Sequence, residues 1–119
     1  MKYMLLIYGD EKAGPEFGSP EFGPYMGAYK AATETYVKDG VMVAGEALEP
    51  VATATSVRVR GGRTETMDGP YAETKEQLGG FYILDCKNLD EAIRYAAMIP
   101  DAANGTVEIR PVMDLSAVM

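Results

Sequence analysis

The chain of 119 residues is 47% hydrophobic and 24% charged, which is the composition of a globular domain and excludes a disordered one. Its 11 basic and 18 acidic residues give a net charge of −7, which disfavours nucleic acid as a partner. One cysteine and no histidine exclude intrachain disulfides, histidine general bases, histidine-assisted nucleophiles and histidine-ligated metals. We therefore expect one domain over residues 1–119, with no cofactor and no metal.

The first strand is expected at Lys2–Tyr8, where apolar side chains occupy both sets of alternate positions. A strand that is apolar on both faces is typical of the middle of a covered sheet. This apolar run ends at Tyr8 and lacks the cleavage site of a signal peptide. No stretch reaches the ~20 apolar residues of a membrane span. We therefore predict a soluble, cytoplasmic protein without a membrane partner.

Residues 9–23 form a loop rich in glycine and proline, in which the sequence PEFG occurs twice. Such a loop is either mobile surface or a lid whose Phe17 and Phe22 cover a pocket. A helix is predicted over Pro24–Asp39 and is ended by Gly40. We expect its tyrosine rings to pack in the core or in an interface, with the hydroxyls at the rim. The residues that share this face at helical spacing are Tyr25, Tyr29, Thr33, Tyr36 and Val37.

A second strand is predicted at Val41–Leu48, and Glu46 within it is either an exposed edge carboxylate or part of a ligand site. Thr55–Met67 then forms a hairpin, because Gly61–Gly62 suits a two-residue loop with positive φ. One face of this hairpin is expected to be apolar and the other charged and solvated. The loop fixes the register, which pairs Arg60 with Arg63, Val59 with Thr64, Arg58 with Glu65 and Val57 with Thr66.

A further strand is predicted at Gly79–Cys86, and it is again apolar on both faces. Asn88 is expected to cap a second helix, with Glu91 in the capping-box position, and this helix continues to about Ile99. Thr106–Val112 alternates like an edge strand, with a proline near its end. The predicted buried stripe of the second helix consists of Leu89, Ala92, Ile93, Ala96 and Ile99.

Apart from the hairpin, the elements follow the order βαββαβ, which predicts an α+β, ferredoxin-like fold with an inserted β-hairpin. Two helices cover only one face of such a sheet, yet two of its strands are apolar on both faces. We expect a second copy of the sheet to cover the other face across a two-fold axis. The sequence thus predicts a homodimer with a barrel-like interior and a pocket between the two sheets.

Four blocks of the sequence resemble the YCII-related, or DGPF-domain, family. They are residues 1–11, 43–50, 53–85 and 108–113, and the most specific stretch reads DGPYAETKEQLGG from Asp68 to Gly80. The motif that names the family ends in Phe, whereas this chain carries Tyr71 at that position. The resemblance implies the dimeric α/β barrel variant of the ferredoxin-like fold. It also implies a regulatory context, because members of this branch are often encoded beside extracytoplasmic-function sigma factors.

The family has no agreed biochemical activity, so the resemblance does not imply a reaction. Related members are similar in architecture to muconolactone isomerase, and one branch has a His–Asp pair proposed as an active site. The histidine of that pair has no counterpart here. From the residues themselves, Asp68 is the candidate catalytic residue, because it lies at a strand end that faces the expected inter-sheet cavity. It acts there either as a desolvated general base or only as a turn residue. The candidate ligand-binding residues are Tyr8, Glu46, Gly69, Pro70, Tyr71, Glu73, Lys75 and Tyr82.

Each of these candidates has a plain structural alternative. Gly69, Gly79 and Gly80 meet backbone demands such as positive φ or close approach. Glu73, Lys75 and Glu76 form a solvated loop with local ion pairing. Two functions follow: a small-ligand-binding or regulatory module, or a cofactor-free isomerase or lyase that uses a carboxylate base on a small metabolite. Partnering through Arg58, Arg60 and Arg63 is a third, weaker reading.

Overall fold

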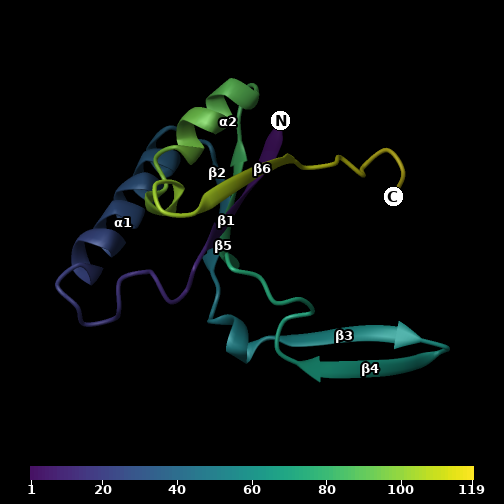
Figure 1. Cartoon of the computed structure of the whole chain (residues 1–119). Helices are drawn as coiled ribbons and strands as arrows, with labels where there is room; N and C mark the ends of the chain where they lie inside the picture. The colour runs from purple at the N-terminus through teal and green to yellow at the C-terminus, as the bar shows by residue number, and fades with distance from the viewer.

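The computed structural model describes residues 1–119 and contains two helices and six strands (Figure 1). Four strands form one antiparallel sheet in the order β2-β5-β1-β6, and the other two form a separate hairpin, β3-β4. Short 3-10 turns follow β2 (η1, Val51–Thr53) and α2 (η2, Pro100–Ala102). In chain order the elements are β1 Lys2–Gly9, α1 Phe22–Lys38, β2 Met42–Ala47, β3 Thr55–Arg60, β4 Arg63–Asp68, β5 Gln77–Asp85, α2 Leu89–Ala96 and β6 Thr106–Pro111.

The sheet is built from two strand–helix–strand units that interlock. Helix α1 joins β1 to β2, and β5 lies between these two strands; α2 joins β5 to β6, and β1 lies between those. The α+β class is confirmed. The strand predicted at Lys2–Tyr8 is central, and the strand predicted at Thr106–Val112 lies at an edge, as expected.

Both helices lie on the same side of the sheet, and the core fills the space between the two layers (Figure 1). Alternate positions of β1 and β5 point to this side, because side chains of a strand alternate between its faces. Tyr36 of α1 is fully buried, with its ring centroid 5.0 Å from that of Tyr82 and 5.4 Å from that of Tyr95. The core consists of Tyr3, Leu5, Ile7, Ala32, Tyr36, Val41, Tyr82, Leu84, Cys86, Ala92, Tyr95, Ala96 and Ile99.

The predicted start of the second helix is confirmed, but its predicted buried stripe is partly wrong. Asn88 Oδ1 accepts a 2.9 Å hydrogen bond from the Glu91 N–H, as an N-cap does. Leu89 and Ile93, however, are about half exposed, and Tyr95 is buried instead. The buried positions still follow helical spacing, but the stripe is rotated towards Tyr95, whose hydroxyl donates to Asp39 at the end of α1.

One residue of the predicted tyrosine face of the first helix is also misplaced. Val37 is 61% exposed, although it was expected to share that face. Each residue of a helix is rotated by about 100° from its neighbour. Because Tyr36 points straight into the core, the side chain that follows it is turned to solvent.

No helix covers the opposite face of the sheet. Leu6 pairs with Phe81 and Met4 pairs with Ile83, so a strip of apolar side chains crosses the two central strands on this side. All four residues are partly buried rather than buried. The sheet is open at both edges, and one chain forms no closed barrel. A covering layer for this open face would have to come from outside the two helices.

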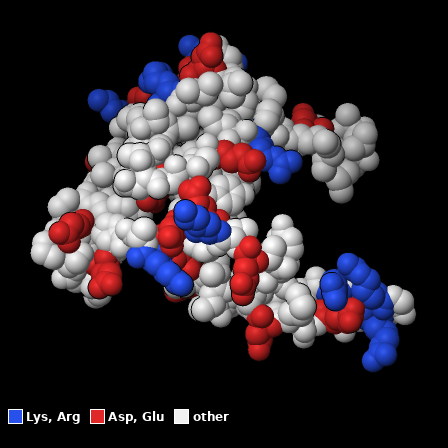
Figure 2. All heavy atoms as spheres, in the orientation of Figure 1, with Lys and Arg blue, Asp and Glu red and all other residues white.

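The β3-β4 hairpin has the predicted register at all four pairs. Gly61 and Gly62 adopt φ of 58° and 76°, as a two-residue turn with positive φ requires. The hairpin extends away from the sheet (Figure 1), and basic side chains gather at its far end (Figure 2), where Arg60 and Arg63 flank the turn. Its expected apolar face is exposed as well: Val57 is 62% and Val59 is 58% exposed.

The projecting hairpin makes the chain wide and thin. The Cα radius of gyration is 16.5 Å and the molecule measures 48 × 46 × 18 Å. A compact domain of this length has a radius of gyration of about 13–14 Å. Neither helix has the length and apolar character needed to cross a lipid bilayer.

Candidate functional site

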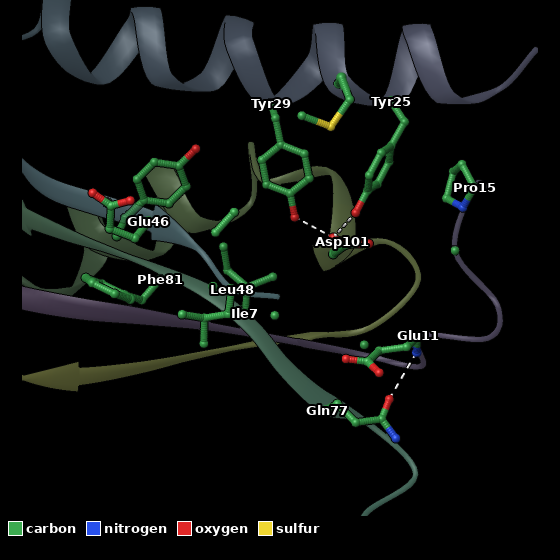
Figure 3. Close-up of a pocket in the computed structure, with 18 of the residues that line it drawn as sticks. Ile7, Glu11, Pro15, Tyr25, Tyr29, Glu46, Leu48, Gln77, Phe81 and Asp101 are labelled. Carbon is green, nitrogen blue, oxygen red and sulfur yellow. Dashed lines mark hydrogen bonds between the residues drawn. The ribbon is translucent and has the colours of Figure 1, made fainter. Parts of the chain in front are cut away.

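A cavity of about 660 Å³ lies beneath the N-terminal half of α1 (Figure 3). Its roof is α1, its floor is the end of the sheet where β2 and β5 meet, and the loop after β1 and the η2 turn complete it. The wall combines aromatic rings with polar groups. The aromatic residues that line it are Phe22, Tyr25, Tyr29, Phe81 and Tyr82, and the acidic ones are Asp10, Glu11, Glu46 and Asp101.

Two tyrosines of α1 meet one carboxylate in this cavity. Tyr25 and Tyr29 are four residues apart, so their side chains leave the same face of the helix. Their rings pack edge to face, with centroids 5.3 Å apart. Both hydroxyls donate to Oδ2 of Asp101 in η2, Tyr25 over 2.6 Å (Figure 3). Two phenols of one helix and a carboxylate more than 70 residues later in the chain are thereby held in one fixed cluster.

Burial and the neighbouring carboxylate keep both phenols protonated. Burial, followed by the hydrogen bond and the charge of Asp101, raises the pKa of Tyr25 to about 12. The same causes in the same order raise the pKa of Tyr29 further. A negative phenolate beside a carboxylate in a poorly solvated site is unfavourable, so the neutral form persists. At neutral pH the two tyrosines therefore act as hydrogen-bond donors.

A second hydroxyl chain fixes the inner end of the cavity. Thr33 of α1 donates from Oγ1 to the carbonyl of Tyr29 over 3.0 Å. Its hydroxyl hydrogen is thus used, so Tyr82 of β5 is the donor in the 2.7 Å bond between the Tyr82 and Thr33 hydroxyls. This bond joins the helix to the sheet and orients the Tyr82 ring in the wall.

The mouth of the cavity is held by the loop after β1. The N–H of Glu11 donates to Oε1 of Gln77 over 3.0 Å (Figure 3). The Glu11 carboxylate accepts from the N–H of Val51 over 3.1 Å. These bonds tie the loop to the start of β5 and to η1. The acidic side chains of the wall do not converge closely enough for three of them to hold one metal ion.

Two of the residues predicted from the sequence line this cavity. Glu46 lies on β2, paired with Phe81 of β5, and Tyr82 lies next to that pair. Tyr8 does not line it; it pairs with Leu78 near the end of β1. The roles of Glu46, Tyr82 and Tyr8 as ligand-binding residues stay predictions.

The DGPY stretch lies outside the cavity. Asp68 ends β4 opposite Thr55 and is exposed. Gly69 follows with φ of 95°, donates its N–H to the Ala54 carbonyl over 2.7 Å and accepts the Ser56 hydroxyl over 2.9 Å. This geometry closes the base of the hairpin, as expected of a glycine with a backbone role.

The predicted ligand residues Pro70, Tyr71, Glu73 and Lys75, which follow this turn, do not line the cavity either. Pro70 is partly buried, and Tyr71, at 88% exposed, and Glu73 are at the surface. Lys75 lines a separate, shallow hollow next to Asp10. Within one chain these predicted ligand residues are therefore not brought together with Glu46 and Tyr82.

Of the two phenylalanines that the sequence suggested as a lid, only Phe22 lines the cavity. Phe22, the first residue of α1, lines the cavity together with Gly14 and Pro15. Phe17 is 90% exposed and packs edge-on against Phe22 with the ring centroids 5.3 Å apart. The loop thus borders the cavity, which is compatible with the lid prediction for Phe22 but places Phe17 outside.

Asp101 was not among the candidates predicted from the sequence. It follows Pro100 in a stretch that looks like an ordinary helix-ending turn. The sequence signal for this cluster came from the tyrosines that bind Asp101. Tyr25 and Tyr29 are phenols one helical turn apart, and buried phenols need a polar partner. Only the packing of the η2 turn against α1 shows which carboxylate that partner is.

The matches to known proteins include both the residues of the cavity and those of the hairpin. The YCII-related domain matches residues 1–116 of the chain. The chain is also 39% identical over 113 residues to an uncharacterised protein of Rhizobium meliloti (strain 1021), a match that covers 93% of this chain and 91% of that protein. The resemblance seen in the sequence is thereby confirmed, and the chain belongs to the YCII-related family.

Proposed function

We propose that this protein is a small-ligand-binding module that works as a homodimer. The observation that carries the proposal is the cavity under α1, in which Tyr25 and Tyr29 are both held by Asp101. A concave, largely apolar site with a few fixed polar groups is the usual form of a small-molecule site. Its volume of about 660 Å³ suits a metabolite-sized ligand.

The dimeric part of the proposal rests on the open face of the sheet. The apolar strip formed by Met4, Leu6, Phe81 and Ile83 is left uncovered by the helices, and the hairpin extends with its valines exposed. A second copy packed on this face would bury both. This arrangement is the ferredoxin-like, dimeric α/β barrel expected for the family, and its two-fold symmetry makes the same patch serve on both subunits.

A cofactor-free isomerase or lyase is the second candidate, and the carboxylate in the cavity favours it. Asp101 rather than Asp68 would then serve as the base, because Asp101 lines the cavity and Asp68 does not. Tyr25 and Tyr29 would stabilise a developing enolate by hydrogen bonding. Both phenols already bind Asp101, however, so they would have to exchange partners during the reaction. Ligand binding without turnover needs no such exchange.

A cytoplasmic location and a link to sigma-factor regulation follow only from the single cysteine and from the family resemblance. They stay predictions, and they fit a ligand-responsive dimer. The regulatory reading gains support if the bound ligand changes the dimer's affinity for a protein partner encoded with it.

The proposal is tested with the full-length chain by a thermal-shift screen against small amines, alcohols and carboxylic acids, followed by calorimetry. We expect at least one compound to raise the melting temperature and Tyr29→Phe to weaken its binding. Tyr71→Phe is the matched control, because it removes a hydroxyl that is exposed and outside the cavity. A ligand that binds both variants equally well, or a screen in which nothing binds, contradicts a site under α1.

The assembly is measured separately by analytical ultracentrifugation of the same preparation. We expect a stable dimer at micromolar concentration, since an obligate interface of this kind is large and apolar. A monomer throughout the concentration range contradicts the dimeric part of the proposal and leaves the ligand site standing.

A further inference from the structure

We propose that the cavity under α1 selects an organic cation, an amine or guanidinium group carried on an apolar body. This inference rests on the proposed function, because it names the class of ligand for the same site. It concerns the charge of the wall, which the family resemblance leaves open.

The charge of the wall has a single sign. Four acidic residues line the cavity, Asp10, Glu11, Glu46 and Asp101, whereas no lysine or arginine does. Glu46 pairs with Phe81 and therefore shares that residue's face of the sheet. The three ion pairs of the chain join other groups: the N-terminus with Asp85, Lys30 with Glu34 and Arg58 with Glu65. None of these four acidic residues takes part in an ion pair, and Lys75, which shares a neighbouring hollow with Asp10, lies outside the cavity.

An uncompensated acidic wall acts against anionic ligands. Sites for carboxylates and phosphates present arginine, lysine or a cluster of free N–H donors. Here the nearest fixed donors, the phenols of Tyr25 and Tyr29, already bind a carboxylate of the chain itself. The net charge of −7 adds a repulsive field over the whole molecule. A small carboxylic acid would thus meet repulsion without a compensating contact.

The anchor for a cation is the second oxygen of Asp101. Both tyrosine hydroxyls donate to Oδ2, so Oδ1 receives neither of these bonds and can accept an N–H from a ligand. The two phenols fix the plane of the carboxylate, and a preorganised acceptor loses little freedom on binding. Figure 3 shows this carboxylate at the tips of both rings, with Glu46 and Glu11 on opposite sides of the cavity.

The remaining wall suits the apolar body of such a ligand. Phe22, Tyr25, Tyr29 and Tyr82 contribute aromatic rings. An aromatic face attracts a cation as well as a hydrocarbon, so the same rings favour an ammonium group next to an apolar chain. Since the carboxylates are spread around the wall and do not gather into one set of ligands, an extended organic cation fits better than a metal ion.

The experiment compares three probes that share one body: benzylamine, benzyl alcohol and benzoate, titrated calorimetrically into the full-length protein at neutral pH. We expect the amine to bind at least about tenfold more tightly than the alcohol, because a charge-assisted hydrogen bond is markedly stronger than a neutral one. Benzoate is expected to bind more weakly than the alcohol. The amine's advantage should shrink as salt is added.

Two variants assign the selectivity to Asp101. Asp101→Asn keeps an oxygen that the phenols can bind but removes the charge, so we expect the amine to lose about tenfold in affinity and the alcohol to be unaffected. Glu34→Gln removes an exposed charge of α1 outside the cavity and should change neither. Circular dichroism and melting temperature check that both variants fold.

The outcomes separate the two proposals. If the alcohol or benzoate binds as tightly as the amine, the cavity is a ligand site but the selection of a cation is wrong. If calcium or magnesium alone binds and displaces the amine, the acidic wall is a metal site and the inference is overturned. If no probe binds at millimolar concentration, the inference and the proposed ligand site fail together.

Discussion

The hydroxyl of Tyr36 donates a 2.6 Å hydrogen bond to the backbone carbonyl of Tyr95 and so joins the two helices through the core. Tyr36 is completely buried, and its bond lies between the two helices on the covered side of the sheet. Removing this hydroxyl leaves the ring in place and deletes a single buried bond.

We therefore expect Tyr36→Phe to lower the free energy of unfolding by about 1 kcal/mol, the usual net value of such a bond. The measurement is urea unfolding at fixed protein concentration, because stability depends on concentration in an oligomer. Tyr71→Phe, at a side chain that is 88% exposed, should leave the midpoint unchanged. Equal midpoints for wild type and Tyr36→Phe would show that the bond contributes nothing net.

The glycine pair at the start of β5 gives a second prediction. A Cβ on Gly80 would lie 2.8 Å from the backbone oxygen of Glu46 in β2, whereas a Cβ on Gly79 meets nothing closer than 3.9 Å. Because backbone yields less readily than a side chain, we expect Gly80→Ala to destabilise the protein by about 1–3 kcal/mol. Gly79→Ala should stay within about 0.5 kcal/mol. Similar melting temperatures for the two variants would contradict this.

The tyrosine cluster predicts how stability changes in alkali. Burial and Asp101 raise the pKa of Tyr25 from the ordinary 10.0 to about 12, and that of Tyr29 moves in the same direction. The folded state therefore favours the protonated phenol, so this contribution is complete below pH 10 and is lost as pH rises towards 12. Tyrosinate absorbance and urea midpoints should show late ionisation together with falling stability.

The double variant Tyr25→Phe and Tyr29→Phe isolates this effect, because it removes two late-titrating phenols. Its stability should decline less steeply between pH 10 and pH 12 than that of the wild type. Tyr36, whose pKa burial also raises, stays in the variant and accounts for a remaining decline. If the stability of the variant and of the wild type fell in parallel between pH 10 and pH 12, the tyrosine cluster would not be the cause of the loss of stability.

The open face of the sheet predicts a variant that separates folding from assembly. Leu6 lies on that face opposite Glu108 of β6. In a single chain, Leu6→Lys can pair with this carboxylate, but in a dimer it would place a charge in an apolar interface. We expect a folded protein that sediments as a monomer. Ala31→Lys on the exposed side of α1 is the control and should sediment like the wild type. A dimeric Leu6→Lys protein would exclude this face as the interface.

Local signals in the sequence were sufficient for much of the fold. Two consecutive glycines, Gly61 and Gly62, fix the turn geometry, and the register of the hairpin follows from it residue by residue. Asn88 marks the start of α2, because its side chain satisfies an N–H of the first turn. Each of these signals acts over a few residues, so no knowledge of the tertiary structure is needed to interpret it.

Features that depend on contacts between distant segments were not predictable in this way. The stripe of α2 was misplaced because Tyr95 packs against distant residues, among them Tyr36 and Asp39, which lie 59 and 56 residues earlier in the chain. Asp101 was overlooked because Tyr25 and Tyr29 lie more than 70 residues before it. The residues that flank Asp101 in the sequence give no indication that it contacts Tyr25 and Tyr29. Only the packing of η2 against α1 reveals the cluster.

The position of β1 has a consequence for the newly made chain. It comes first among the six strands described, yet both of its neighbours follow much later in the chain: Lys2 pairs with Asp85, and Tyr3 pairs with Pro111. Pairings between residues so distant in sequence form slowly. The apolar segment from Met4 to Ile7 therefore stays unpaired until β5 has left the ribosome, and during that interval it is exposed to chaperones and to aggregation.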